Sequence, residues 1–210
     1  MKRDRQLLSV ASILLVFITG SANAALLEGT DPRFGPNSLT IDTRTQLAWL
    51  DLTDTLGLSY QQVLAETAPG MPFSGYRFAT LQEVTNLFYS AGITLGYYPL
   101  ASPAIQSFIS LVGQTQTIEG YPALFGLTGT PRVNQGSLYL RAAIYASGIN
   151  GSLFYLAEND FSIDQNLSFP DMGSWLVTTV PEPTSLTIGL LGLCGLSILR
   201  SRRGDPATTA

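Results

Sequence analysis

The sequence predicts an α+β domain, with two strands at its start, three helices in its middle and several antiparallel strands at its end. Apolar and polar residues alternate at 39–42, and the short, largely apolar run at 47–52 follows a turn, so both are expected to be strands. Three later segments combine a helix start signal with apolar residues three and four positions apart. Beyond residue 120, apolar and aromatic runs separated by turn residues indicate strands again.

The first two strands are expected to form a hairpin, because residues 43–46 between them have the composition of a turn. In the second strand the alternation places residues 48, 50 and 52 on one face and residues 47, 49 and 51 on the other. We therefore expect Trp49 to be a core or sheet-face aromatic rather than a platform for a ligand.

Each of the three helices begins at a recognisable start signal. Ser59 with Gln62, and Thr80 with Glu83, fit the capping box, and Pro103 suits the first position of the third helix. The predicted buried residues are Tyr60, Val63 and Leu64 in the first helix, Leu81, Val84, Leu87, Phe88 and Ala91 in the second, and Ile105, Phe108, Ile109 and Val112 in the third. Gly92 and Gly113 are expected to end the second and third helices.

The C-terminal half is predicted to consist of strands at 123–127, 138–146, 152–157 and 175–179. Residues 148–151 form a turn signal between the second and third of these, so we expect that pair to be a hairpin.

Residues 1–24 have the form of a secretory signal peptide. A basic head is followed by an uncharged apolar run at 7–20, and Ala22 and Ala24 are the small residues of an A-x-A site, so cleavage is expected after Ala24. A permanent N-terminal anchor is the alternative, but the run reaches only about 21 Å, against roughly 30 Å for a hydrocarbon core.

The C-terminal segment joins three unlike elements in a fixed order. Pro181, Glu182 and Pro183 precede an uncharged stretch at 184–199, which predicts a hydrophobic transmembrane helix, and Arg200, Arg202 and Arg203 then mark the cytoplasmic side. A short tail, 204–210, follows. An ordinary single-pass tail anchor is the alternative to the interpretation below.

This order resembles the PEP-CTERM sorting signal, over residues 181–203. The resemblance implies an exported protein of a Gram-negative bacterium that is held briefly in the inner membrane. An exosortase would then process it near the Pro-Glu-Pro motif and release it to the cell surface or the extracellular biofilm matrix. Signal peptidase and the exosortase are the partners that this route implies.

Residues 25–180 remain as one mature domain. They carry twelve acidic residues and five arginines, a net charge of −7 that disfavours nucleic acid as a partner. The chain has no histidine, and its only cysteine, Cys194, and only lysine, Lys2, lie outside this range. Catalysis by a thiol, an imidazole or a lysine is therefore excluded for the mature domain, and only carboxylate chemistry remains. We expect no cofactor, no metal and no catalytic residue.

Three stretches of the mature domain resemble bacterial exported domains of C-type-lectin-like fold: DTRTQLAWLD at 42–51, GYRFATLQEV at 75–84 and SWLV at 174–177. In that family the first stretch is an opening hairpin, the second leads into the main helix, and the third is a closing strand, here expected to return beside the hairpin. The resemblance implies a fold and no particular ligand.

Two groups of residues are candidates for ligand binding. Glu158, Asn159 and Asp160, with Asp164 and Asn166 after them, would suit calcium if they formed a loop, and a solvated turn is the alternative. The aromatic residues Phe154, Tyr155 and Phe161 would suit stacking on a sugar, and the alternative is core packing.

Three functions follow as hypotheses. The first is a structural or interaction protein of the cell surface or biofilm matrix, with other surface proteins as partners. The second is a lectin-like module that binds extracellular polysaccharide. The third is a glycosidase that uses carboxylates alone. We expect the protein not to be an enzyme, because its only candidate catalytic groups are acidic residues scattered along the sequence.

Overall fold

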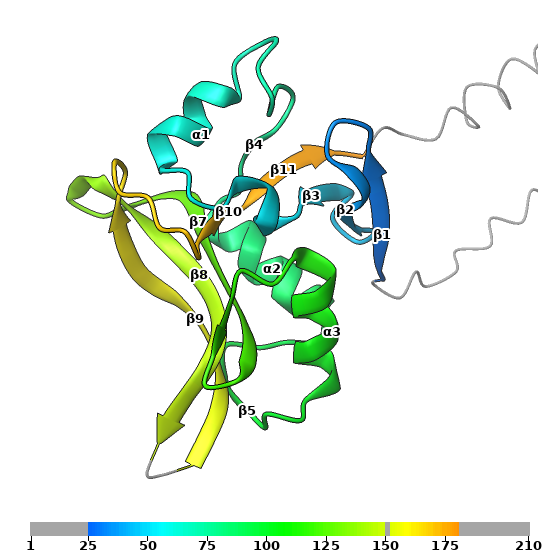
Figure 1. The fold of residues 1–210 in the computed structure, drawn as a ribbon, viewed down its shortest axis with the longest axis vertical. Helices are drawn as coiled ribbons and strands as arrows, with labels where there is room; N and C mark the ends of the chain where they lie inside the picture. Colours follow the sequence, from blue (N-terminus) through cyan, green and yellow to red (C-terminus); the bar gives the residue numbers. More distant parts are fainter. Residues whose placement is uncertain (1–24, 150–151, 181–210) are drawn as a thin grey trace, which may run out of the picture.

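The computed structural model describes residues 25–149 and 152–180 and confirms the α+β class. Two sheets lie at an angle, with helices packed between and beside them (Figure 1). The elements in order are β1 (Leu26–Asp31), β2 (Gly35–Asp42), β3 (Leu47–Leu50), a short 3-10 helix η1 (Leu52–Thr55), α1 (Tyr60–Glu66), β4 (Arg77–Phe78), α2 (Leu81–Ser90), β5 (Gly96–Tyr98), α3 (Pro103–Val112), β6 (Gln116–Ile118), β7 (Tyr121–Arg132), β8 (Gln135–Ile149), β9 (Ser152–Asp164), β10 (Gly173–Ser174) and β11 (Leu176–Thr179).

The smaller sheet brings the two ends of the domain together. Its five strands lie in the order β1-β2-β3-β11-β4, and all neighbours are antiparallel. The expected β2–β3 hairpin is present, and β11 pairs with β3 so that Val177 faces Trp49 across the ladder. The prediction that the closing strand returns beside the first hairpin is confirmed.

The larger sheet has the strand order β10-β7-β8-β9-β5, with β6 paired to the outside of β7. The expected hairpin between β8 and β9 is confirmed and runs from the pair Leu138–Asp164 to the pair Ile149–Ser152. Figure 1 shows its far end projecting beyond the helices. The C-terminal strand then changes sheets: β10 pairs with β7, β11 pairs with β3, and Trp175 lies at the crossing.

The helix starts are formed as the sequence predicts. Capping boxes are complete at Ser59 and at Thr80, and α3 begins at Pro103. The stripe of four residues predicted for α3 is buried, and Val84, Leu87 and Phe88 of α2 are buried in the same core. None of the helices in the described ranges is long and apolar enough to span a bilayer.

The core is centred on aromatic rings where the two sheets meet. Trp49 and Trp175 form an edge-to-face pair with centroids 6.0 Å apart, and Phe88 of α2 packs edge-on to Trp175 at 6.1 Å. Apolar side chains of β7 and β8, including Leu124 and Ile144, complete this cluster. Trp49 is therefore a core residue, as its position in the strand predicts.

Several sequence predictions are wrong in detail. Strand β3 ends at Leu50, and Leu52 turns into η1 and joins the same cluster as Trp49, instead of sharing a face with Ala48. Leu64 is 44% exposed, because α1 has only seven residues and covers the sheet with Tyr60 and Val63. Strand β1 was not predicted from the sequence. The predicted helix at 184–199 lies outside the described residues.

Candidate functional site

The first and last described residues bind the same β-turn. The backbone N–H of Ala25 donates to Oγ1 of Thr43 at 3.1 Å, and the N–H of Thr43 donates to the carbonyl of Ala25 at 3.2 Å. Across the turn, the N–H of Val180 donates to the carbonyl of Gln46 at 3.1 Å. The predicted processing residues Ala22 and Ala24 precede this point, and Pro181, Glu182, Pro183, Arg200, Arg202 and Arg203 follow it. All of them lie outside the described residues.

The stretch at 75–84 is explained by contacts inside the domain. Gly75 has a backbone φ of +89°, a conformation that favours glycine. Arg77 binds Glu83 through both terminal nitrogens, at 2.9 Å and 2.6 Å, and Glu83 also accepts the backbone N–H of Thr80 at 2.8 Å. The bonds from Arg77, and then those from Thr80, lower the pKa of Glu83 to about 2, although burial opposes them. This carboxylate therefore stays ionised and serves to hold the start of α2.

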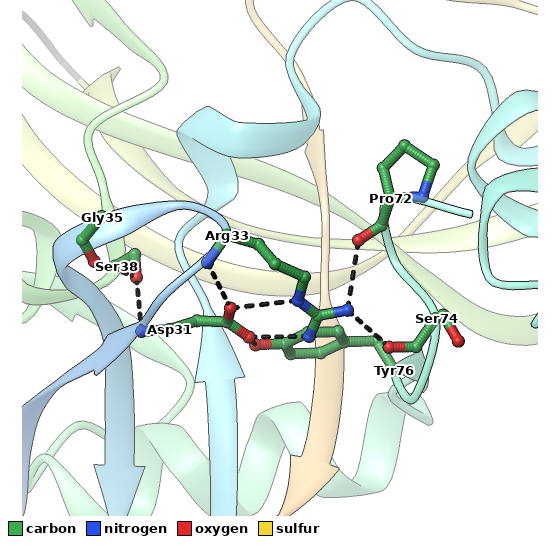
Figure 2. Close-up of polar contacts among 7 residues, drawn as sticks. All are labelled: Asp31, Arg33, Gly35, Ser38, Pro72, Ser74 and Tyr76. Atoms are coloured by element: carbon green, nitrogen blue, oxygen red, sulfur yellow. Dashed lines mark hydrogen bonds and ion pairs between the residues drawn. The ribbon is translucent and has the colours of Figure 1, made fainter. Parts of the chain in front are cut away.

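A second ion pair, which sequence reasoning missed, ties the β1–β2 hairpin to the loop before β4 (Figure 2). Asp31 accepts two bonds from the guanidinium of Arg33, at 3.0 Å and 2.7 Å, and one from the hydroxyl of Tyr76 at 2.7 Å. Nη1 of Arg33 donates onward to the carbonyls of Pro72 and Ser74, at 3.3 Å and 2.6 Å. The bond from Arg33 holds the pKa of Asp31 far below its usual value, although burial opposes this.

This cluster borders a shallow apolar groove on the outer face of the smaller sheet. The groove has a volume of about 330 Å³, and its lining includes apolar Leu39, Ile41 and Ala48, with Tyr76, Val180 and the hydroxyl residues Thr178 and Thr179. Its one titratable carboxylate, that of Asp31, is bound to Arg33 and has no capacity to exchange a proton near neutral pH. The groove has room for an apolar group, but the residues lining it supply no acid or base.

Asp51 and Asp54 are carboxylates whose pKa the fold raises. Burial, followed by the charges of Asp54 and Glu28, raises the pKa of Asp51 to about 7. Burial and the charge of Asp31 also raise the pKa of Asp54. One carboxylate oxygen on each is buried without a hydrogen-bond partner. Neither residue lines the groove on the smaller sheet.

The predicted calcium loop is wrong. Residues 158–160 belong to β9, where Glu158 opposes Ala143 and Phe161 opposes Arg141, with a register shift between these two pairs. A polar run in a bulged strand resembles a loop in sequence, and the alternative of a solvated turn fails for the same reason. Asp164 accepts two bonds from Asn166, two residues away. Within the part of the chain that the structure describes, no group of three acidic or thiol side chains is arranged to hold a metal ion.

Of the three aromatic residues named for stacking, the side chain of Phe161 lies within the described structure. It is 56% exposed, and the guanidinium of Arg141 lies 4.6 Å from its ring centroid. The same guanidinium lies 4.7 Å from the ring of the buried Phe125. Phe161 is therefore not a core residue. The side chains of Phe154 and Tyr155 lie outside the described part.

The residues that sequence reasoning missed are those whose partners are distant in the chain. Arg33 and Tyr76 are 43 positions apart, and neither lies in a motif that predicts contact with the other. Asp31 ends β1 and Arg33 lies in the turn that follows, where the Arg33 backbone N–H also donates to the Asp31 carboxylate at 2.8 Å. Comparison with known protein families, with curated proteins and with solved structures found no match to this chain.

Proposed function

We propose that this chain is an exported, exosortase-sorted protein whose mature domain serves as a structural or interaction module at the cell surface or in the biofilm matrix. The observation that carries the proposal is the shared turn at residues 43–46. Ala25 binds one side of the turn and Val180 binds the other. The two predicted signals therefore attach at neighbouring points of one sheet, and removing both would leave every described strand pair in place.

A C-type-lectin-like arrangement is the finer proposal for the fold. Three features support it: the stretch at 42–51 supplies the turn of the β2–β3 hairpin and the whole of β3, the stretch at 75–84 leads through β4 into α2, and the stretch at 174–177 returns to the hairpin as β11. The residues that carry the resemblance cap a helix, bridge two elements or fill the core. Their roles are structural, which fits a scaffold on which a binding surface is placed elsewhere.

The arrangement of carboxylates supports a non-catalytic role. Asp31 and Glu83 are held in their charged form by arginines, so they are poor general acids. Asp51 has a pKa suited to proton transfer, but it follows β3 at the start of η1 and does not line the groove. A glycosidase would need two carboxyl groups facing each other across a cleft.

The sorting proposal is tested by replacing Pro181, Glu182 and Pro183 together with alanine in an exosortase-positive host. We expect this variant to remain in the inner membrane at its unprocessed mass, whereas the native chain reaches the surface in a trimmed form. The matched control replaces Gly204, Asp205 and Pro206 with alanine, which also removes one acid and a proline, and it should be processed like the native chain. Normal surface delivery and trimming of the first variant would refute the proposal.

A further inference from the structure

Asn166, Leu167 and Ser168 form the N-x-S pattern of an asparagine that accepts an N-linked oligosaccharide. The middle residue is not proline, and the pattern is used in surface loops of exported proteins. Because the pattern is short, its meaning depends on where the fold places it. An asparagine that is buried or paired inside a sheet is out of reach of a modifying enzyme, whereas one in an exposed loop is accessible.

The fold places all three residues at the surface, in the connection between β9 and β10. Strand β9 ends at Asp164, β10 begins at Gly173, and residues 166–168 between them are exposed, Leu167 by 52%. The last residue pair of the β8–β9 ladder is Leu138 with Asp164, so the pattern begins after the ladder has ended. An enzyme can therefore reach the asparagine without separating two strands.

A short turn holds the asparagine at this position. The backbone N–H and the side-chain Nδ2 of Asn166 both donate to Oδ1 of Asp164, at 2.9 Å and 3.1 Å. The N–H of Leu167 donates to the carbonyl of Asp164 at 3.1 Å, which closes the turn. These bonds join residues two and three positions apart, so breaking them to present Nδ2 to an enzyme leaves the strand pairs of both sheets in place.

Both ends of the exposed stretch are fixed to the rest of the domain. Before it, the carbonyl of Gln165 accepts the backbone N–H of Gln61 in α1 at 3.1 Å. After it, the carbonyl of Phe169 accepts the N–H of Gly57 at 3.2 Å. Residues 166–168 can therefore leave their turn and enter an active site while the structure on either side stays folded.

We propose that Asn166 is an N-glycosylation site, which takes an oligosaccharide from a lipid diphosphate donor. Nδ2 attacks the anomeric carbon of the first sugar, a C–N bond forms, and the C–O bond to the diphosphate breaks. The lipid diphosphate leaves with the electron pair of that bond, and one proton of Nδ2 passes to a base of the transferase. The inference rests on the proposed export, because this modification belongs to exported proteins.

The experiment incubates the purified full-length protein with an active bacterial oligosaccharyltransferase and an oligosaccharide on a lipid diphosphate. Chymotrypsin cuts at aromatic residues between Asn166 and Asn150, the other asparagine with a serine two positions on, so mass spectrometry of the peptides separates the two. We expect the Asn166 peptide to gain one oligosaccharide, Ser168→Ala to lower its occupancy by at least about tenfold, and Ser168→Thr to keep it. Asn134 is the matched control, because it is exposed but has a glycine two positions on, and its peptide should keep its mass.

Three outcomes would overturn the site: no added mass on Asn166 of the native protein, equal occupancy in Ser168→Ala, or an equal gain on Asn134. Modification of a synthetic peptide of residues 162–169 but not of the folded protein would also overturn it, because the fold would then hide the asparagine. Thermal unfolding of the two serine variants separates a missing hydroxyl from a changed fold. The assay uses purified protein, so its failure is distinct from a failure of the proposed export route.

Discussion

The indole of Trp175 packs directly on the backbone of Gly126. A Cβ atom at position 126 would lie 2.7 Å from Cδ1 of Trp175 and 2.8 Å from Cδ2 of Leu52. The Nε1–H of this indole donates to the carbonyl of Ala142 at 3.3 Å, so the ring is fixed on both sides. Because Trp175 lies where the C-terminal strand passes from one sheet to the other, this contact sets the spacing between the sheets.

Gly126→Ala should therefore destabilise the domain. Trp175 and Leu52 are fully buried and have no free space into which to move, and overpacking of this kind typically costs about 1–3 kcal/mol. The matched control is Gly136→Ala in the neighbouring strand β8, where an added Cβ would meet no atom within 4 Å. Urea unfolding should show a clear loss for the first variant and almost none for the second. Equal stabilities would mean that Trp175 does not pack on Gly126.

Leu87→Ala should cost roughly 2–5 kcal/mol in the free energy of unfolding, because it leaves a cavity in the cluster shared by α2 and both sheets. Leu64→Ala makes the same chemical change on α1, where the side chain is half exposed, and it should cost less than about 1 kcal/mol. Chemical denaturation of the two variants checks the difference. Similar losses would show that the burial described for α2 is wrong.

The helices were predictable because their signals are local. A capping box spans four residues, and the apolar spacing of α3 repeats within ten, so the relevant contacts lie inside the window from which they were predicted. The capping box at Thr80 even identifies Glu83 as a helix-start carboxylate. It does not reveal that Arg77 binds the same group, since that contact depends on how β4 enters the helix.

The errors arose where tertiary contacts overrode local pattern. Leu52 continues the alternation of β3 in sequence, yet the chain tightens into η1 because Gly173 and Gly126 leave space for Leu52 between the sheets. Glu158 and its polar neighbours resemble a loop, but pairing with β8 keeps them in a strand. Strand β1 carries few apolar residues and is held by its pairing with β2. No local sequence pattern predicts that pairing.

Glu83→Gln should lower stability above about pH 4.5 and have little effect near pH 2. The native pKa of Glu83 is lowered to about 2, so its ionised form stabilises the fold above about pH 4.5, and this contribution is lost as the pH falls toward 2. The glutamine variant has no ionised carboxylate whose stabilising contribution could be lost. Its melting temperature should therefore fall less steeply than that of the native protein between pH 4.5 and 2. Parallel curves for the two proteins would contradict the ion pair with Arg77.

Asp51 should have the opposite effect on stability. Its folded pKa is raised to about 7 by burial and by the charges of Asp54 and Glu28, whereas in the unfolded chain the carboxyl has its ordinary pKa of 3.8. The protonated form is the one the fold tolerates, so the contribution of Asp51 is fully present below about pH 4 and is lost as the pH rises through 7. Asp51→Asn should reduce the decrease in stability as the pH rises through 7. The melting temperature should therefore be higher than that of the native protein at pH 8 and almost unchanged at pH 4.

The control for Asp51→Asn is Glu119→Gln, which removes the same charge from an exposed turn. A general relief of the domain's negative charge would raise the melting temperature of both variants at pH 8, because repulsion among acids acts over the whole surface. A local effect at Asp51 would raise only the first, since its carboxylate has a buried oxygen without a hydrogen-bond partner. Equal shifts would assign the pH dependence to net charge, and no shift in either variant would show that Asp51 is already neutral or well solvated at pH 8.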